Sequence, residues 1–211
     1  MYRIAILDDY QNRSLQAAEW GSIANAEITV FNEFLGHDNR QIAESLMPFE
    51  VVVVMRERTR FPSELLCSLE NLRLLVTAGM RNGAIDMLVA RAQNIDVCGT
   101  EMRGYPAFEH TWALIMAAAK NIPQQMQNLQ NGRWQQGLAR GLFGQRLGLY
   151  GYGRIAKQVA DYARAFNMQV EWWGSDRGRA RAKADGRAVA ESRAAFFAKN
   201  DIVSVLSLIH I

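Results

Sequence analysis

The sequence GYGRIA at residues 151–156 limits most strongly what this chain can fold into. It follows an apolar run expected to form a strand, RLGLY at 146–150, and it opens an expected helix at 154–166. In a loop of the form G-x-G-x-x-G/A, the first glycine makes a tight turn and the second lets the backbone approach a pyrophosphate. The helix N-terminus then offers free N–H groups to the anion. A glycine turn that only packs is the alternative. The expected dinucleotide loop consists of Gly151, Tyr152, Gly153, Arg154 and Ile155.

The choice of cofactor depends on the end of the next expected strand. An acidic residue about 20 positions after the loop accepts the ribose 2′-hydroxyl of NAD. Gly174 stands where an Asp is often found, and Glu171 lies within the strand. Asp176 is a candidate slightly later, whereas Ser175 and Arg177 are suited to a 2′-phosphate. The sequence slightly favours NAD, with NADP possible.

Strand-like and helix-like segments alternate along most of the chain, which predicts βαβ units and a parallel sheet. The run VVVVM at 51–55 is apolar throughout, as expected for a strand covered on both faces. The expected strands are 3–7, 27–31, 51–55, 73–77, 96–98, 146–150, 169–173 and 202–206, with a short one at 188–189. The expected helices between them are 11–20, 40–46, 63–69, 85–92 and 154–166.

Two expected helices in the middle of the chain have no strand partner. The stretch 108–121 is apolar, and 124–134 is Gln-rich with an apolar stripe at Met126, Leu129 and Trp134. Such a stripe needs cover. A partner subunit is one source of that cover, and the rest of the chain is the other.

Composition excludes several classes of protein. The net charge of +3 is mild, and the basic run 177–187 contains Asp185, which indicates a solvated helix face rather than a nucleic-acid surface. Cys67 and Cys98 lack the spacing of a disulfide scaffold or a zinc site, and we expect both to be buried and no metal to be bound. No apolar run reaches the roughly 18 residues of a membrane span, and no leader is apparent, so a cytoplasmic protein is expected.

Three segments, in order, resemble the D-isomer-specific 2-hydroxyacid dehydrogenases. LRLLVTAGMRNGAID at 72–86 is similar to the family's substrate-loop segment, and EHTWAL at 109–114 to the helix that opens its cofactor domain. LGLYGYGRIAKQVA at 147–160 is similar to its glycine loop. The resemblance covers roughly residues 3–205.

The resemblance implies an α/β fold in which a flavodoxin-like substrate domain, residues 1–98, is followed by an incomplete Rossmann dinucleotide-binding domain, residues 99–211. It implies a homodimer through helices 108–134. It also implies that the amides of Met80 and Arg81 hold the substrate carboxylate, that Arg56 lies near the substrate, and that Thr111 contacts the cofactor. The family usually has Gly where this chain has Arg81.

The family's catalytic Arg, Glu (or a similar acid) and His are not found in this sequence, and we expect them beyond Ile211. His210 is not their counterpart, because LSLIHI at 206–211 departs from the family pattern. The resemblance therefore implies hydride transfer between NAD(P) and a small 2-hydroxy or 2-keto acid, in a chain that is inactive by itself. The alternative function is a non-enzymatic dinucleotide-sensing module. The sequence does not name the acid.

Overall fold

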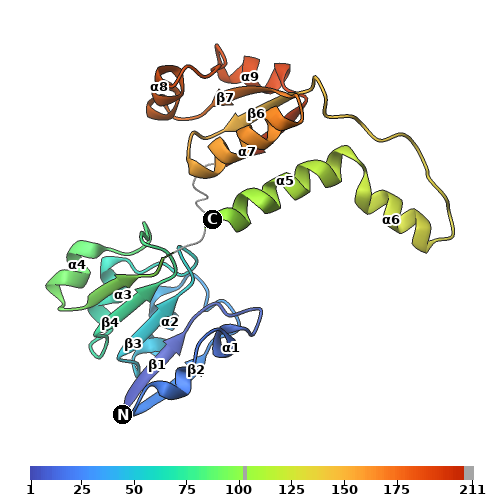
Figure 1. Ribbon diagram of the computed structural model, residues 1–211. Coiled ribbons are helices and arrows are strands. Elements are labelled where there is room, and N and C mark those ends of the chain that lie inside the picture. The colour runs from blue at the N-terminus through green and yellow to red at the C-terminus, as the bar shows by residue number, and fades with distance from the viewer. Residues whose placement is uncertain (102–103, 207–211) are drawn as a thin grey trace. The chain divides into compact units, whose positions relative to one another are not determined.

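A computed structural model describes residues 1–101 and 104–206 of the protein. These residues form two compact units, 1–101 and 104–206 (Figure 1). The expectations about the segment 207–211, including His210, lie outside the described residues. Each unit is built on its own parallel sheet.

The first unit is a five-stranded parallel sheet with the strand order β2-β1-β3-β4-β5. This order, 2-1-3-4-5, is that of flavodoxin-like proteins, so the expected architecture is confirmed. Its strands are β1 Tyr2–Ile6, β2 Ala26–Val30, β3 Val51–Val54, β4 Leu74–Thr77 and β5 Asp96–Gly99. Its helices are α1 Ser14–Ala17, α2 Asn39–Leu46, α3 Ser63–Ser68 and α4 Met87–Ala92, with a 3-10 turn at Trp20–Ser22.

The expected helix at 11–20 is much shorter in the structure, where α1 covers Ser14–Ala17. The carboxylate of Asp9 accepts hydrogen bonds from the amides of Arg13 and Ser14, at 2.9 and 2.8 Å. The chain therefore turns at Asp9 before any helix begins. No residue of α1 is buried, so nothing extends the helix by packing.

The second unit has the strand order β7-β6-β8, and an isolated parallel bridge joins Trp172 to Val189 on β7. With that bridge as a third strand, the order becomes 3-2-1-4, the first four positions of a doubly wound dinucleotide fold. Figure 1 shows α7 and α9 on opposite sides of this sheet. The Rossmann part of the expected fold is confirmed. Its elements after the helical arm are β6 Arg146–Tyr150, α7 Arg154–Ala165, β7 Gln169–Trp173, α8 Asp176–Ala184, α9 Arg193–Lys199 and β8 Ile202–Val205.

Helix α9 was not predicted from the sequence. Its Phe196 is fully buried and packs so tightly on β6 that a Cβ at Gly148 would lie 2.8 Å from the phenyl ring. Only one of its seven residues is buried, which is too little for a recognisable periodicity. Gly148 was therefore the better indication of a helix packed on β6, because a glycine within a strand often marks the close approach of another segment.

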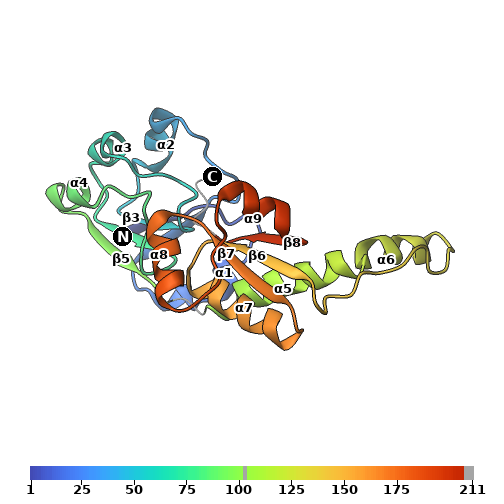
Figure 2. The ribbon, with the colours of Figure 1, turned by 90° about the horizontal axis from the view of Figure 1, so that it is seen from above.

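Helices α5 Tyr105–Ala119 and α6 Ile122–Gln130 form an arm that extends from the sheet of the second unit (Figure 2). The first turns of α5 are held on α7 by aromatic contacts, with Trp112 and Phe166 centred 5.0 Å apart. The returning chain is tied to the arm by Arg140, whose amide donates to the carbonyl of Ala119 at 2.9 Å. Apolar side chains nevertheless remain exposed on the arm, among them Met126 and Leu129.

Two further findings concern the two cysteines and the search for a helix that could span a membrane. Cys67 and Cys98 are exposed, so the expectation that both are buried is wrong; Cys98 is on the outermost strand, β5, and Cys67 is on the outer face of α3. Within the described ranges, no helix is long and apolar enough to cross a membrane.

Candidate functional site

The glycine loop between β6 and α7 has the geometry of an anion-binding turn. Gly151 has a φ of 115°, in the region that favours glycine. A Cβ added to Gly153 would meet no atom within 4 Å, so the loop faces open space there. Among the described residues, the amides of Gly153, Arg154 and Ile155 have no protein acceptor. Free N–H groups at the start of a 12-residue helix suit a phosphate group.

The position of this loop in the sheet supports the same use. β6 lies between β7 and β8, so the strand order reverses at the carboxyl end of β6. Ligands of doubly wound folds bind at this switch point. Ala156 is fully buried against the sheet, which is the close helix–strand packing that the motif predicts.

The side chain of Tyr152 points into the protein and not toward the loop's open side. Its ring contacts Trp172 edge-on at 4.7 Å, and its hydroxyl donates to Asp185 at 2.5 Å. Lys157 completes the group, with its ammonium 2.9 Å from Asp185. The Tyr152 hydroxyl, followed by Lys157, lowers the pKa of Asp185. The carbonyl of Tyr152 accepts from the guanidinium of Arg181 at 3.0 Å, so only the backbone amide of Tyr152 is left to serve the site, and its side chain braces the loop.

The other expected cofactor residues lie at three places in the second unit. The guanidinium of Arg154 lies against the backbone at Gly104, where a Cβ would come within 2.8 Å of it. Thr111 is on α5, and its hydroxyl donates to the carbonyl of Ala107 at 2.7 Å. The remaining three residues begin α8, directly after β7: Ser175, Asp176 and Arg177.

The expected carboxylate loop in the first unit follows β4. Among the residues described, the amides of Met80 and Arg81 have no acceptor, and both side chains are exposed. Gly99 permits this arrangement, since a Cβ there would lie 2.8 Å from the Cα of Met80. Asn82 fixes the far side of the loop by donating to the carbonyl of Arg56 at 2.7 Å and to Thr77. The structure thus joins the Met80–Arg81 loop to the Arg56 loop.

Two further residues, Asp8 and Thr59, lie at the switch point of the first unit. The order β2-β1-β3 reverses between β1 and β3, and these residues follow those two strands. The Thr59 hydroxyl donates to the Asp8 carboxylate at 2.9 Å, and both residues are buried. Asp8 also has a left-handed backbone, with a φ of 61°. Sequence analysis missed both; the signal was the Asp-Asp pair that ends an apolar strand.

Asp8→Asn should stabilise the protein at neutral pH. Burial raises the pKa of Asp8, while the Thr59 hydrogen bond and the charge of Arg58 lower it, so the folded state favours the neutral acid. Asparagine keeps an acceptor for Thr59 and tolerates the left-handed backbone. We expect the free energy of unfolding at pH 7 to rise, measured by urea denaturation. The gain should shrink as the pH falls through the raised pKa, because wild-type Asp8 is then neutral as well.

The neighbouring residue, Asp9, provides a control, because its substitution should change the free energy of unfolding in the opposite direction. The amides of Arg13 and Ser14 hold the pKa of Asp9 below its usual range, so its charge stabilises the fold at neutral pH and this contribution is lost on acidification. Asp9→Asn should therefore destabilise the protein at pH 7. Equal shifts for the two variants would contradict this account of Asp8.

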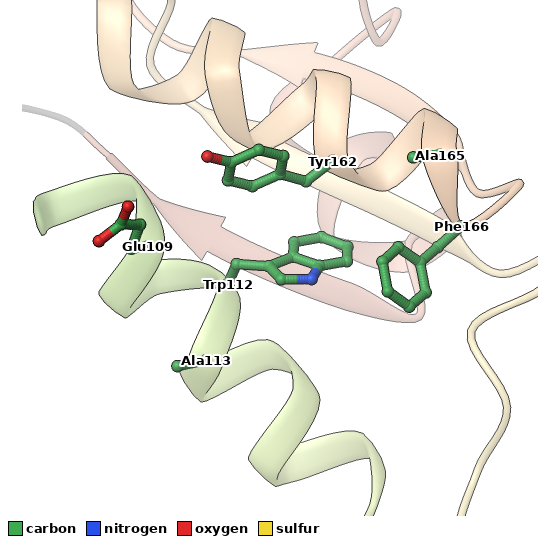
Figure 3. Close-up of a pocket in the computed structure, with 6 residues that line it drawn as sticks. All are labelled: Glu109, Trp112, Ala113, Tyr162, Ala165 and Phe166. Atoms are coloured by element: carbon green, nitrogen blue, oxygen red, sulfur yellow. The ribbon is translucent and has the colours of Figure 1, made fainter. Parts of the chain in front are cut away.

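A shallow pocket of about 420 Å³ lies between α5 and α7 (Figure 3). Its walls are apolar except for Glu109, and Figure 3 shows Trp112 between Tyr162 and Phe166. The pocket is lined by Glu109, Trp112, Ala113, Tyr162, Ala165 and Phe166. It holds none of the free amides described above, so we do not assign it to the anion site.

Comparison with known proteins agrees with this geometry. The family model described as "D-isomer specific 2-hydroxyacid dehydrogenase, NAD binding domain" matches residues 112–209. A phosphoglycerate oxidoreductase from Vibrio cholerae o395 has a similar structure, with a TM-score of 0.81 and 36% identity, over 99% of this chain and 67% of that one. A putative D-3-phosphoglycerate dehydrogenase from Ralstonia solanacearum gives a TM-score of 0.82 and 36% identity, over 99% and 66%.

The chain belongs to the D-isomer-specific 2-hydroxyacid dehydrogenase family. The resemblance inferred from the three sequence segments is confirmed, and NAD is the cofactor of the domain that the family model describes. The free amides and the open side of the glycine loop fit the pyrophosphate of that cofactor. The hydroxypyruvate reductase of Thermotoga maritima is 28% identical over 172 residues. That match covers 80% of this chain but only 54% of the length of the relative.

Proposed function

We propose that this dehydrogenase-family chain is part of an oxidoreductase that transfers a hydride between NAD and a small 2-hydroxy or 2-keto acid. The observation that carries the proposal is the glycine loop, whose unpartnered amides lie at the switch point of a sheet in the 3-2-1-4 order. We place the activity in the cytoplasm, where NAD and small hydroxy acids are both present.

We assign residues 1–98 to the substrate domain and residues 99–211 to the NAD-binding domain. In the first, the free amides of Met80 and Arg81 are suited to a carboxylate, and the side chain of Arg56 adds a positive charge from the adjoining loop. In the second, the glycine loop binds the pyrophosphate. Arg154, Thr111 and the start of α8 contact the remainder of the cofactor.

Oxidation of a 2-hydroxy acid moves a hydride from C2 to the nicotinamide, and the hydroxyl proton goes to a base. We assign that base, with the Arg and the acid that support it, to a part of the relatives that this chain does not cover. The chain spans 54% of the Thermotoga maritima relative and 32% of the D-3-phosphoglycerate dehydrogenase of Methanocaldococcus jannaschii. We therefore expect this chain to bind the dinucleotide without turning over.

A titration with NADH tests the proposal, followed by an assay of NADH oxidation with a panel of small 2-keto acids. We expect saturable binding, seen as quenching of tryptophan fluorescence, and no oxidation above the blank. A chain that is folded by circular dichroism but does not bind would contradict the dinucleotide site. Turnover would support the oxidoreductase function and contradict the assignment of catalysis to other residues.

We also propose a homodimer through the helices at 108–134. Ile122, Met126 and Leu129 are spaced to lie along one side of α6, and each is more than two-fifths exposed. A second copy of this chain would cover that stripe by an isologous contact. Met126→Glu combined with Leu129→Glu should convert the dimer to a monomer, because charges are strongly disfavoured in the centre of an interface. Light scattering after size exclusion measures the mass.

Gln127→Glu is the matched control, since Gln127 is an exposed residue of the same helix. It should leave the dimer intact. A wild-type chain that is monomeric at high micromolar concentration would refute the proposed contact.

A further inference from the structure

The position directly after β7 is unsuited to an acidic residue, which is the residue type that selects NAD. In a doubly wound domain this position faces the adenosine ribose, where an acidic residue accepts the 2′-hydroxyl and a nearby Arg accommodates a 2′-phosphate. Here the position is Gly174, with a φ of 152°. A Cβ at Gly174 would lie 3.3 Å from the amide nitrogen of Gly151. The backbone itself therefore disfavours an aspartate at this position.

The other acidic candidate within β7 is already engaged. The carboxylate of Glu171 accepts a hydrogen bond from Asn200 at 3.2 Å and lies 4.0 Å from the guanidinium of Arg146. Its side chain is 14% exposed. Glu171 belongs to the contact of β7 with β6 and α9, and it is not at the carboxyl end of the strand.

A cation is held at the end of β7. The guanidinium of Arg179 lies 4.2 Å from the centre of the Trp173 ring and donates to the carbonyl of Gly174 at 2.6 Å. These two contacts hold it at the end of β7, with 28% of its side chain exposed. Arg177 is a second exposed cation two residues earlier, about half a turn around the helix, and the Ser175 hydroxyl caps the helix by accepting from the amide of Gly178 at 3.2 Å. That hydroxyl keeps its own proton for another acceptor.

Asp176 competes with a phosphate for Arg179, with which it forms an ion pair. Its side chain is 93% exposed, and ion pairs at such exposure contribute little. A phosphate dianion forms stronger, bidentate contacts with a guanidinium. Helix α8 as a whole carries Arg177, Arg179, Arg181 and Lys183 against the single acid Asp176.

We propose that the site accepts a 2′-phosphorylated dinucleotide as well as NAD, with the phosphate held by Arg179 and the Ser175 hydroxyl. NADPH then binds at least as tightly as NADH. This inference rests on the proposed function, because it takes the glycine loop to hold the pyrophosphate.

The test compares the dissociation constants of NADH and NADPH for the chain and two variants at one fixed ionic strength. Arg179→Gln should weaken the binding of NADPH by about tenfold, because a hydrogen-bonded charge is lost. It should weaken the binding of NADH by much less. Lys183→Gln removes an exposed cation in the last turn of α8, and it should change the two affinities alike.

Two results would overturn the inference alone: NADH binding tighter than NADPH binding, or an equal loss of both affinities in Arg179→Gln. Asp176→Asn separates the two readings of the ribose site. It should strengthen NADPH binding if Arg179 holds a phosphate, because the phosphate then has no competing carboxylate, and it should weaken NADH binding if Asp176 holds the 2′-hydroxyl. A folded chain that binds neither dinucleotide contradicts the proposed function as well.

Discussion

Gly153→Trp should abolish dinucleotide binding while leaving the fold intact. A side chain at Gly153 would point into open space, so the substitution causes no clash within the protein. That open space adjoins the free amides of the loop, where we expect the pyrophosphate, and an indole there would keep the phosphate away from them. We expect the dissociation constant of NADH to rise by roughly 100-fold or more, which corresponds to about 3 kcal/mol. Isothermal titration calorimetry measures it without relying on the added tryptophan.

Gly141→Trp is the matched control. A Cβ at Gly141 also meets nothing within 4 Å, and Gly141 lies in the segment before β6, outside the glycine loop. Its affinity for NADH should equal that of the wild type. An unchanged affinity in Gly153→Trp would show that the dinucleotide does not approach this loop.

Trp172→Ala should cause the largest loss of stability in the second unit. Trp172 is 2% exposed and is among the largest fully buried side chains. Its ring supports Tyr152, and through it the glycine loop and Asp185. Removing a buried aromatic side chain leaves a cavity and costs about 3–5 kcal/mol. The free energy of unfolding from urea titrations followed by circular dichroism should fall by that amount.

The adjacent Trp173 is the natural comparison, because it differs mainly in environment. It is half-buried and covered by Arg179. Trp173→Ala should cost much less, about 1–2 kcal/mol, from one cation–π contact and partial burial. Equal losses for the two variants would mean that Tyr152 and its neighbours do not depend on Trp172. Because the chain has two units, each titration should be examined for two transitions.

Short apolar runs, alternating with helix-like segments, and the glycine motif were sufficient to predict strands of both sheets. The runs at 51–55 and 146–150 are short and apolar, and each is bounded by polar or glycine residues, so their strands were found within a residue of their ends. The glycine loop was found because its chemistry requires fixed residue types at fixed spacing. A short apolar run and a loop of fixed residue types are both local properties of the sequence.

What escaped prediction depends on side-chain contacts that are defined only in the folded structure. Asp8 and Thr59 are separated by 51 positions and are joined only when β1 and β3 pair. Arg179 acts at the end of β7 because its guanidinium reaches Trp173 and Gly174 at once. Neither arrangement has a sequence period. Helix α9 was missed for a related reason: its one buried side chain is defined by the strand beneath it.

The strand pairing of the first sheet also bears on how the protein is made. Every pairing among β1 to β5 joins residues within the first 99 positions, and the described pairings of β6 to β8 all lie within the second unit. Domains generally fold as units during synthesis, the N-terminal one first. A nascent chain therefore holds all strands of its first sheet before the ribosome has translated any strand of the second. The unit that carries Met80 and Arg81 can fold while the glycine loop is still unsynthesised.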